Sequence, residues 1–220
     1  MQSTILRMME ETGSRFLNHF PKTFRDYYDP ILGSERGRLA YSARLWRVIE
    51  YMKDRSKRLV LNVGCGMGVE TLDLASYCRD MVGLDIEKKH LKIARELATR
   101  IGKTNVGFVL GDGRRLPFRH NAFSSVLTME TLHHTRPYEE QILREIVRVV
   151  EPDGSVAIMD HNAWSLPYVL YRVALKRWGW RDLVNPRLVK QILSELNMRE
   201  VTSEAGHLTL PIVAGTPNAF

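Results

Sequence analysis

Apolar runs alternate with helical patterns along most of the chain after residue 58. Short runs rich in branched apolar side chains predict buried strands at 59–63, 81–86, 106–110, 123–129 and 155–159. Between these runs, apolar residues recur at every third or fourth position and predict helices over 69–77, 88–100 and 137–150. Strands that alternate with helices in this way predict a doubly wound α/β fold, whose sheet is mostly parallel.

The chain before the first strand has a different pattern. Residues 1–56 predict a helical arm or cap, in which a helix covers 37–52. A turn is expected at Asp29-Pro30, because the residue before a proline disfavours the helical conformation. We therefore divide the chain into this arm and an α/β domain over 57–220.

The C-terminal part predicts the elements that close the sheet. Asn185 is a suitable N-cap and Pro186 a suitable first residue for a helix that ends at Leu196. Two further strands are expected over 198–204 and 207–213. The complete prediction is a Rossmann-like, seven-stranded sheet with an antiparallel last strand and helices on both faces.

The loop after the first strand carries Gly64, Gly66 and Gly68 at alternate positions. Glycine permits a positive φ in a tight turn and lets a ligand approach the backbone closely. The spacing is not the dinucleotide pattern G-x-G-x-x-G, and no G-K-[ST] of a phosphate-binding loop follows. Asp85 ends the next strand, where a carboxylate can accept hydrogen bonds from both hydroxyls of a ribose. These residues predict a ligand with a ribose but no pyrophosphate, such as an adenosine with a bulky 5′ substituent.

With these segments the chain resembles the class I S-adenosylmethionine-dependent methyltransferases, in the subgroup that methylates lipids, quinones and small molecules. The matching segments are NVGCGMG, GLDIE, LGDGRRLPF, FSSVLTMETLHH and EIVRVVEPDGSVAI. The resemblance implies S-adenosylmethionine as cofactor and S-adenosylhomocysteine as product. Two positions depart from the family: Asn62 stands where many members have an acid, and residues 151–154 read EPDG where many have a K-P-G-G turn.

The resemblance also implies which residues bind the cofactor. In the family, the carboxylate after the third strand accepts a hydrogen bond from the exocyclic amine of adenine, and Asp112 matches it. An aromatic residue of the arm often lies near the cofactor, as Tyr28 would. The implied set is Tyr28, Asn62, Gly64, Cys65, Gly66, Gly68, Asp85, Ile86, Asp112, Gly113, Thr128 and Met129. Ordinary packing is the alternative for Tyr28 and for Cys65.

The residues after the fourth strand bear on the acceptor. Enzymes that methylate exocyclic amines of nucleic-acid bases carry an N-P-P-Y type motif here, and those that methylate pyrimidine C5 carry a cysteine. This chain instead has the sequence ETLHH over 130–134. His133, His134 and His161 are candidate bases or substrate contacts, and Asp160 is a further site candidate. The alternative is a structural role in capping or packing the next helix.

No metal site is expected, because adjacent helical residues point apart and no third ligand is apparent. A sulfonium is already an activated leaving group, so the protein mainly supplies alignment and desolvation. A base is needed only where the acceptor must lose a proton early, as for a phenol or an enol carbon. The sequence therefore does not identify the attacking atom.

The segment from Trp164 to Trp180 is unusually rich in aromatic and aliphatic residues. On a helix, Arg172 and Lys176 would share one stripe, which is typical of an interfacial helix or of a lid over an apolar substrate. We interpret 162–184 as a substrate lid, with a helix packed on the core as the alternative.

Composition sets the remaining expectations. Two cysteines indicate no disulfide framework, and no signal peptide or membrane span is seen, so a cytoplasmic protein is expected, with peripheral membrane contact as an option. The net charge of +7 suits anionic lipid, nucleic acid or an acidic substrate. The predicted function is methyl transfer to a small hydrophobic or lipid-linked acceptor. The alternatives are a non-catalytic cofactor-binding partner subunit, suggested by Asn62, and an RNA methyltransferase, suggested by the charge. The sequence does not indicate the oligomeric state.

Overall fold

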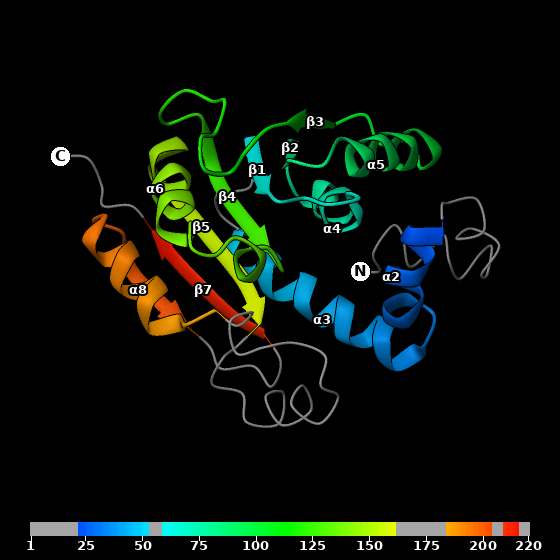
Figure 1. The fold of residues 1–220 in the computed structure, drawn as a ribbon, viewed down its shortest axis with the longest axis horizontal. Coiled ribbons are helices and arrows are strands. Elements are labelled where there is room, and N and C mark those ends of the chain that lie inside the picture. The colour runs from blue at the N-terminus through cyan, green and yellow to red at the C-terminus, as the bar shows by residue number, and fades with distance from the viewer. Residues whose placement is uncertain (1–21, 53–58, 162–183, 204–208, 216–220) are drawn as a thin grey trace.

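The computed structural model describes residues 22–52, 59–161, 184–203 and 209–215 (Figure 1). The aromatic segment from Trp164 to Trp180, and with it nearly all of the predicted lid, lies outside the described residues. So do the first 21 residues of the predicted arm. Among the described residues, no helix is both long and apolar enough to cross a membrane.

One sheet forms the centre of the molecule. Its strands are β1 (Leu59–Val63), β2 (Asp80–Asp85), β3 (Val106–Leu110), β4 (Phe123–Met129), β5 (Val150–His161), β6 (Arg199–Ser203) and β7 (Thr209–Gly215). Their order is β3-β2-β1-β4-β5-β7-β6, with β1 to β5 parallel and β7 antiparallel to both neighbours. The predicted Rossmann-like α/β architecture is confirmed. The order reverses between β1 and β4, and in such sheets ligands bind beyond the carboxyl ends of the strands at this point.

Helices cover the two faces of the sheet (Figure 1). One face packs against α2 (Lys22–Leu32), α3 (Glu35–Met52), α4 (Val69–Leu74) with its 3₁₀ extension η3 (Ala75–Tyr77), and α5 (Lys88–Arg100). The other packs against α6 (Glu139–Val149) and α8 (Pro186–Glu195). The predicted cap of α8 is confirmed, since the Asn185 side chain accepts a hydrogen bond from the backbone N–H of Arg187 at 3.0 Å.

The turn predicted at Asp29-Pro30 is wrong, because both residues lie inside α2. Phe24, Tyr28 and Leu32 recur at every fourth position and are all buried in the core. Burial of this apolar stripe outweighs the local bias against helix and the helical hydrogen bond that Pro30 cannot donate, because proline has no N–H. The helix predicted over 37–52 is confirmed and begins slightly earlier, at Glu35.

Strand β5 is longer than the predicted 155–159, because it begins at Val150. Val150 pairs with Phe123, and the register then shifts before Ser125 pairs with Ser155. Asp153, with a φ of 63°, lies within this irregularity. The segment expected to be a turn between helix and strand is therefore an irregularity inside the ladder, which re-aims the strand that follows.

Candidate functional site

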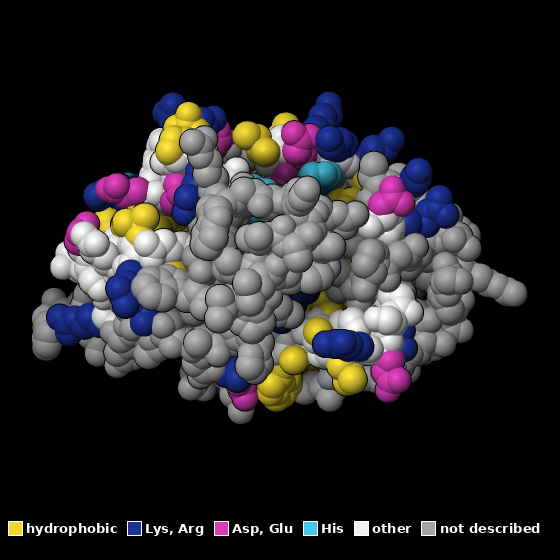
Figure 2. Space-filling model, turned by 60° about the horizontal axis from the view of Figure 1, so that its bottom comes forward, with side chains coloured by type: hydrophobic (Ala, Val, Ile, Leu, Met, Phe, Trp, Pro, Cys, Tyr) yellow, Lys and Arg dark blue, Asp and Glu magenta, His cyan; other side chains and the backbone are white. Residues whose placement is uncertain are grey.

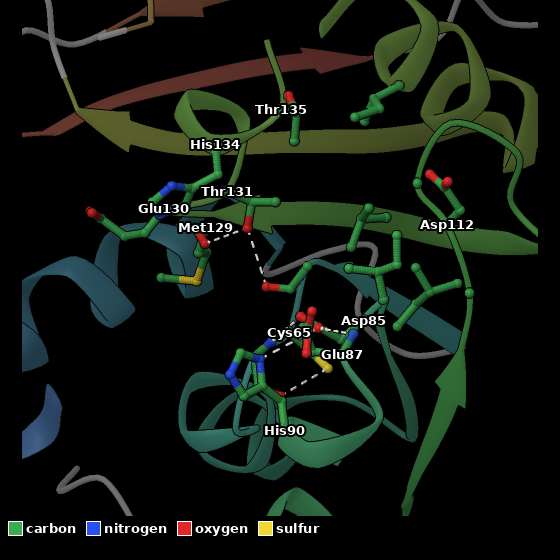
Figure 3. A pocket seen from close by; sticks show the side chains of 18 of the residues that line it. Cys65, Asp85, Glu87, His90, Asp112, Met129, Glu130, Thr131, His134 and Thr135 are labelled. Carbon is green, nitrogen blue, oxygen red and sulfur yellow. Dashed lines mark hydrogen bonds and ion pairs between the residues drawn. The ribbon is translucent and has the colours of Figure 1, made fainter. Parts of the chain in front are cut away.

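A cavity of about 570 Å³ opens beyond the carboxyl ends of β1, β2 and β4. Its wall combines the glycine loop, the residues after β2 and β3, the segment after β4, and α2. Figure 3 shows Asp85, Asp112 and His134 reaching it from different elements. The predicted site residues on its wall are Tyr28, Gly64, Cys65, Gly66, Asp85, Ile86, Asp112, Gly113, Met129 and His134.

The glycine loop is hydrogen-bonded to the carboxyl end of β2. The backbone N–H groups of Gly64 and Cys65 both donate to the carbonyl of Leu84, at 2.8 and 2.9 Å. Gly66 has a φ of 53°, and a Cβ built there would meet no atom within 4 Å. The space beside Gly66 is therefore open toward the cavity, where a ligand can approach the backbone.

Asp85 is fixed in place by backbone donors. One carboxylate oxygen accepts from the N–H of Gly66 at 2.8 Å, and the other accepts from the N–H of Glu87 at 2.8 Å. His90 Nδ1 lies 3.6 Å from the second oxygen. A carboxylate has about four acceptor positions, so capacity remains for hydroxyls of a ligand in the cavity. Ile86 follows, is 62% exposed and adds an apolar surface to the wall.

Asp112 is held by its neighbour Arg114. The backbone N–H of Arg114 donates to Asp112 Oδ1 at 2.9 Å, and its Nε lies 2.9 Å from Oδ2. These hydrogen bonds lower the pKa of the Asp112 carboxyl, so it is ionised at neutral pH. The Arg114 guanidinium also lies 4.8 Å from the centre of the Tyr138 ring.

A further carboxylate of the wall, Glu130, lies on the segment after β4. Glu130 has a φ of 52°, which is uncommon for a residue other than glycine, and its backbone N–H donates to Met159. Its side chain lies 3.1 Å from Arg44 of α3. The next residue, Thr131, donates from its hydroxyl to the carbonyl of Gly64 at 3.2 Å. Through these contacts, the segment after β4 is connected to β5, to the glycine loop and to α3 of the arm.

The structure separates the candidate histidines. His133 is 4% exposed, and its Nδ1 lies 2.6 Å from Asp160 Oδ1. Asp160 Oδ2 accepts from the backbone N–H groups of Thr131 and Leu132, at 3.1 and 2.8 Å. His134 lies on the cavity wall (Figure 3). His161 ends β5, and its side chain lies outside the described residues.

The expectation that His133 and His134 point apart is wrong. They belong to a 3₁₀ turn, η4 (Leu132–His134), and their ring centres are 3.8 Å apart. Within the described residues, no group of His, Cys, Asp and Glu side chains is arranged to hold a metal ion.

Three of the predicted cofactor-binding residues do not line the cavity: Asn62, Gly68 and Thr128. Asn62 is buried, and its Nδ2 donates to Thr71 Oγ1 at 2.9 Å, while its Oδ1 has no partner among the described residues. Gly68 has a φ of 82° at the start of α4, where a Cβ would lie 2.7 Å from that of Ala94. Thr128 is 1% exposed within the sheet.

The cavity wall also includes residues that the sequence analysis missed. Among them is Glu70, whose Oε2 accepts from the Tyr28 hydroxyl at 3.2 Å. Desolvation by burial raises the pKa of the Glu70 carboxyl. Cys65 is buried, and burial raises the pKa of its thiol well above the ordinary value, so it stays protonated. The sequence signal that could have identified Glu70 as a site residue is its position just after the glycine loop.

Comparisons with known proteins find related sequences and structures. Residues 61–158 match the family described as "Methyltransferase domain". The chain is 29% identical over 116 residues to the uncharacterized methyltransferase YcgJ of Bacillus subtilis, covering 53% of this chain and 46% of that protein. It is 31% identical over 137 residues to a demethylmenaquinone methyltransferase of Lactococcus lactis, covering 60% of this chain and 53% of that protein. The chain thus spans about half the length of these curated relatives.

The fold also matches solved structures. The PH0226 protein from Pyrococcus horikoshii superposes with a TM-score of 0.71 at 21% identity, covering 90% of this chain and 99% of that one. At this identity the match supports the shared fold.

Proposed function

We propose that the protein is a class I S-adenosylmethionine-dependent methyltransferase that transfers a methyl group to a small acceptor, because residues 61–158 match the methyltransferase domain family and the relatives include named methyltransferases. The observation that carries this proposal is the position of Asp85. Two backbone N–H groups hold its carboxylate beside the open backbone of Gly66, on the wall of the cavity. This arrangement suits the hydroxyls of an adenosine ribose.

The same cavity offers further cofactor contacts. Asp112 is ionised and is suited to accept a hydrogen bond from the exocyclic amine of adenine. Ile86 and Met129 provide apolar surface, and Tyr28 brings an aromatic ring from the arm. When bound, the cofactor supplies a methyl group on a sulfonium, which needs alignment more than acid–base help. His134 is the candidate base, because its ring lies on the wall while His133 is buried behind it.

We further propose that the acceptor is hydrophobic or lipid-linked. This is supported by the relative named as a demethylmenaquinone methyltransferase and by the aromatic content of 162–184, which we retain as a proposed lid. In this proposal the arm, residues 1–56, contributes the part of the wall that contains Tyr28. An RNA acceptor has less support. On the face of the molecule drawn in Figure 2, the Lys and Arg side chains of the described residues are spread around the rim and mixed with Asp and Glu.

Calorimetry with S-adenosylmethionine and S-adenosylhomocysteine tests the proposed function. We expect binding in the wild type and a loss of about tenfold or more in Asp85→Ala, because buried hydrogen bonds to a charged group are removed. Asp80→Asn is a matched control, since Asp80 lies at the opposite end of β2 and pairs with Arg79. No binding at millimolar cofactor contradicts the proposal.

The acceptor is tested by transfer of a labelled methyl group to a quinol with an isoprenoid tail, a small amine and bulk tRNA. Labelling of the quinol supports the hydrophobic acceptor. Labelling of the tRNA alone, with binding that falls steeply as salt is added, supports the RNA alternative.

A further inference from the structure

We propose that Glu70, oriented by the Tyr28 hydroxyl, binds the ammonium group on the methionine part of the cofactor. The inference rests on the proposed function, because it assigns a residue to one group of that ligand. Many family members carry an acid at position 62. In this proposal the negative charge comes instead from Glu70, in the first turn of α4.

Position 62 does not provide a charge in this chain. Asn62 is neutral, 2% exposed and absent from the cavity wall. Its Nδ2 group is directed to Thr71 on α4, at 2.9 Å. A cationic group in the cavity therefore needs its counter-charge from another residue.

Among the described residues, the carboxylates on the cavity wall differ in their partners. Asp112 is bound by Arg114, and Glu130 lies 3.1 Å from Arg44. Glu87 is half exposed and lies 3.4 Å from Lys89. Asp85 accepts from two backbone N–H groups and faces His90. Each of these carboxylates already has a charged group or a pair of backbone donors.

Glu70 differs from them in having a neutral partner. Its Oε2 accepts from the Tyr28 hydroxyl at 3.2 Å, and no cationic side chain of the described residues forms an ion pair with it. Both residues line the cavity, although they lie on different helices, α4 and α2. The hydroxyl holds one carboxylate oxygen, and the backbone N–H of Glu70 also donates to the carboxylate. A carboxylate has about four acceptor positions, so capacity remains for a ligand.

The electrostatics favour a cation beside this carboxylate. Removal of the Glu70 carboxyl from water raises its pKa; a backbone hydrogen bond and the charge of Arg44 act in the opposite direction but do not cancel that shift. Glu70 is partly buried, and a carboxylate withdrawn from water without a close cation is costly. An ammonium group that enters the cavity stabilises the ionised form and forms a charge-assisted hydrogen bond with it.

Two ligands separate the ammonium contact from the rest of the site. S-Adenosylhomocysteine carries the amino-acid part, and 5′-methylthioadenosine keeps the adenosine and the sulfur but lacks that part. In calorimetry we expect Glu70→Gln to weaken S-adenosylhomocysteine binding about tenfold or more and to change methylthioadenosine binding less than twofold. Tyr28→Phe should weaken S-adenosylhomocysteine binding several-fold, with the same selectivity. Glu96→Gln, which removes an exposed carboxylate paired with Arg100 on α5, should leave both affinities at the wild-type level.

Other outcomes overturn the inference in distinct ways. Equal losses for both ligands in Glu70→Gln and in Tyr28→Phe mean that the pair shapes the pocket as a whole. A selective loss in Glu130→Gln instead assigns the ammonium group to Glu130. If Glu70→Gln does not fold, an unselective or absent effect of Tyr28→Phe overturns the inference. Wild-type protein that binds neither ligand contradicts the proposed function itself.

Discussion

At the scale of single residues, a close contact explains why the loop after β1 begins with glycine. Gly64 has a φ of 75°, and a Cβ built there would lie 2.2 Å from Thr131 Cγ2. Thr131 is itself held by hydrogen bonds to the carbonyls of Gly64 and Met129. The space beside Gly64 is therefore occupied by a side chain that has little freedom to move.

We expect Gly64→Ala to lower the free energy of unfolding by about 2–4 kcal/mol, from backbone strain together with the clash. Urea denaturation followed by circular dichroism measures this change. Gly102→Ala is the matched control, because Gly102 has a φ of 66° but no atom within 4 Å of a built Cβ. Gly102→Ala introduces the backbone strain without a clash and should lower the free energy of unfolding by about 1 kcal/mol. Equal losses in the two variants would show that the contact with Thr131 is unimportant.

The residue scale also shows what could be predicted for the site. The positions of Asp85 and Asp112 were predictable, because Asp85 ends β2, Asp112 follows β3, and parallel strands end at one edge. That His133 is buried while His134 lines the cavity was not predictable, since it depends on a 3₁₀ turn and on Asp160 in another strand. Glu70 was missed because its partner Tyr28 lies on α2, a helix that was not predicted since a turn was expected at Asp29-Pro30.

At the scale of elements, helix α6 is clamped to the loop before β4. Glu145 Oε2 accepts from the backbone N–H of Leu116 at 2.7 Å. Arg148 bonds to Glu145 and also donates to the carbonyls of Leu116 and Phe118, at 3.0 and 2.9 Å. These bonds satisfy the backbone of a loop that leads away from the cavity wall at Asp112.

This clamp predicts a pH-dependent stability. The hydrogen bond from Arg148, with a smaller contribution from Leu116, lowers the pKa of Glu145 below its ordinary value of 4.5. A lowered folded-state pKa stabilises the fold above the unfolded-state value, and that contribution is lost as pH falls through the folded-state value. We expect Glu145→Gln to destabilise the protein by about 1–2 kcal/mol at pH 7 and by progressively less below pH 4.5.

Urea denaturation at several pH values measures this effect. Glu96→Gln is the control, because the exposed pair of Glu96 with Arg100 should contribute about 0.5 kcal/mol or less. A loss for Glu145→Gln that stays constant from pH 7 to pH 3 would contradict the role of its charge.

Element types were easier to predict than their ends. The core strand β4 and helix α5 match their predicted bounds, because a continuous apolar run and a clear helical period each identify one structure. The start of β5 and the end of α2 were wrong for a shared reason. In both, pairing or burial with distant residues outweighs the local turn preference of proline and its neighbours.

At the scale of the whole molecule, one sheet joins two apolar cores. One core lies between the sheet and α2 to α5, and the other between the sheet and α6 with α8 (Figure 1). Phe24, Tyr28 and Tyr41 of the arm belong to the first core rather than to a separate cluster. The alternation of strands and helices predicted the layers, but the docking of the arm depends on contacts that no local pattern encodes.

This arrangement predicts one cooperative unfolding transition that shifts with ligand. Because the arm shares a core with the sheet, we expect a single transition in calorimetry. A ligand that binds only the folded state at 100 times its Kd adds about 2.7 kcal/mol of stability. For a chain of 220 residues this raises the Tm by roughly 5–10 °C.

S-Adenosylhomocysteine should produce this shift in the wild type, measured by differential scanning calorimetry. Glu70→Gln at the same ligand concentration should show a shift smaller by several degrees, since tenfold weaker binding removes about 1.4 kcal/mol. Glu96→Gln should shift as the wild type does. Two separate transitions would contradict a core shared by arm and sheet, and an unchanged Tm in the wild type would contradict binding at the cavity. A full shift in Glu70→Gln would leave the cavity as the binding site and remove Glu70 from the ammonium contact.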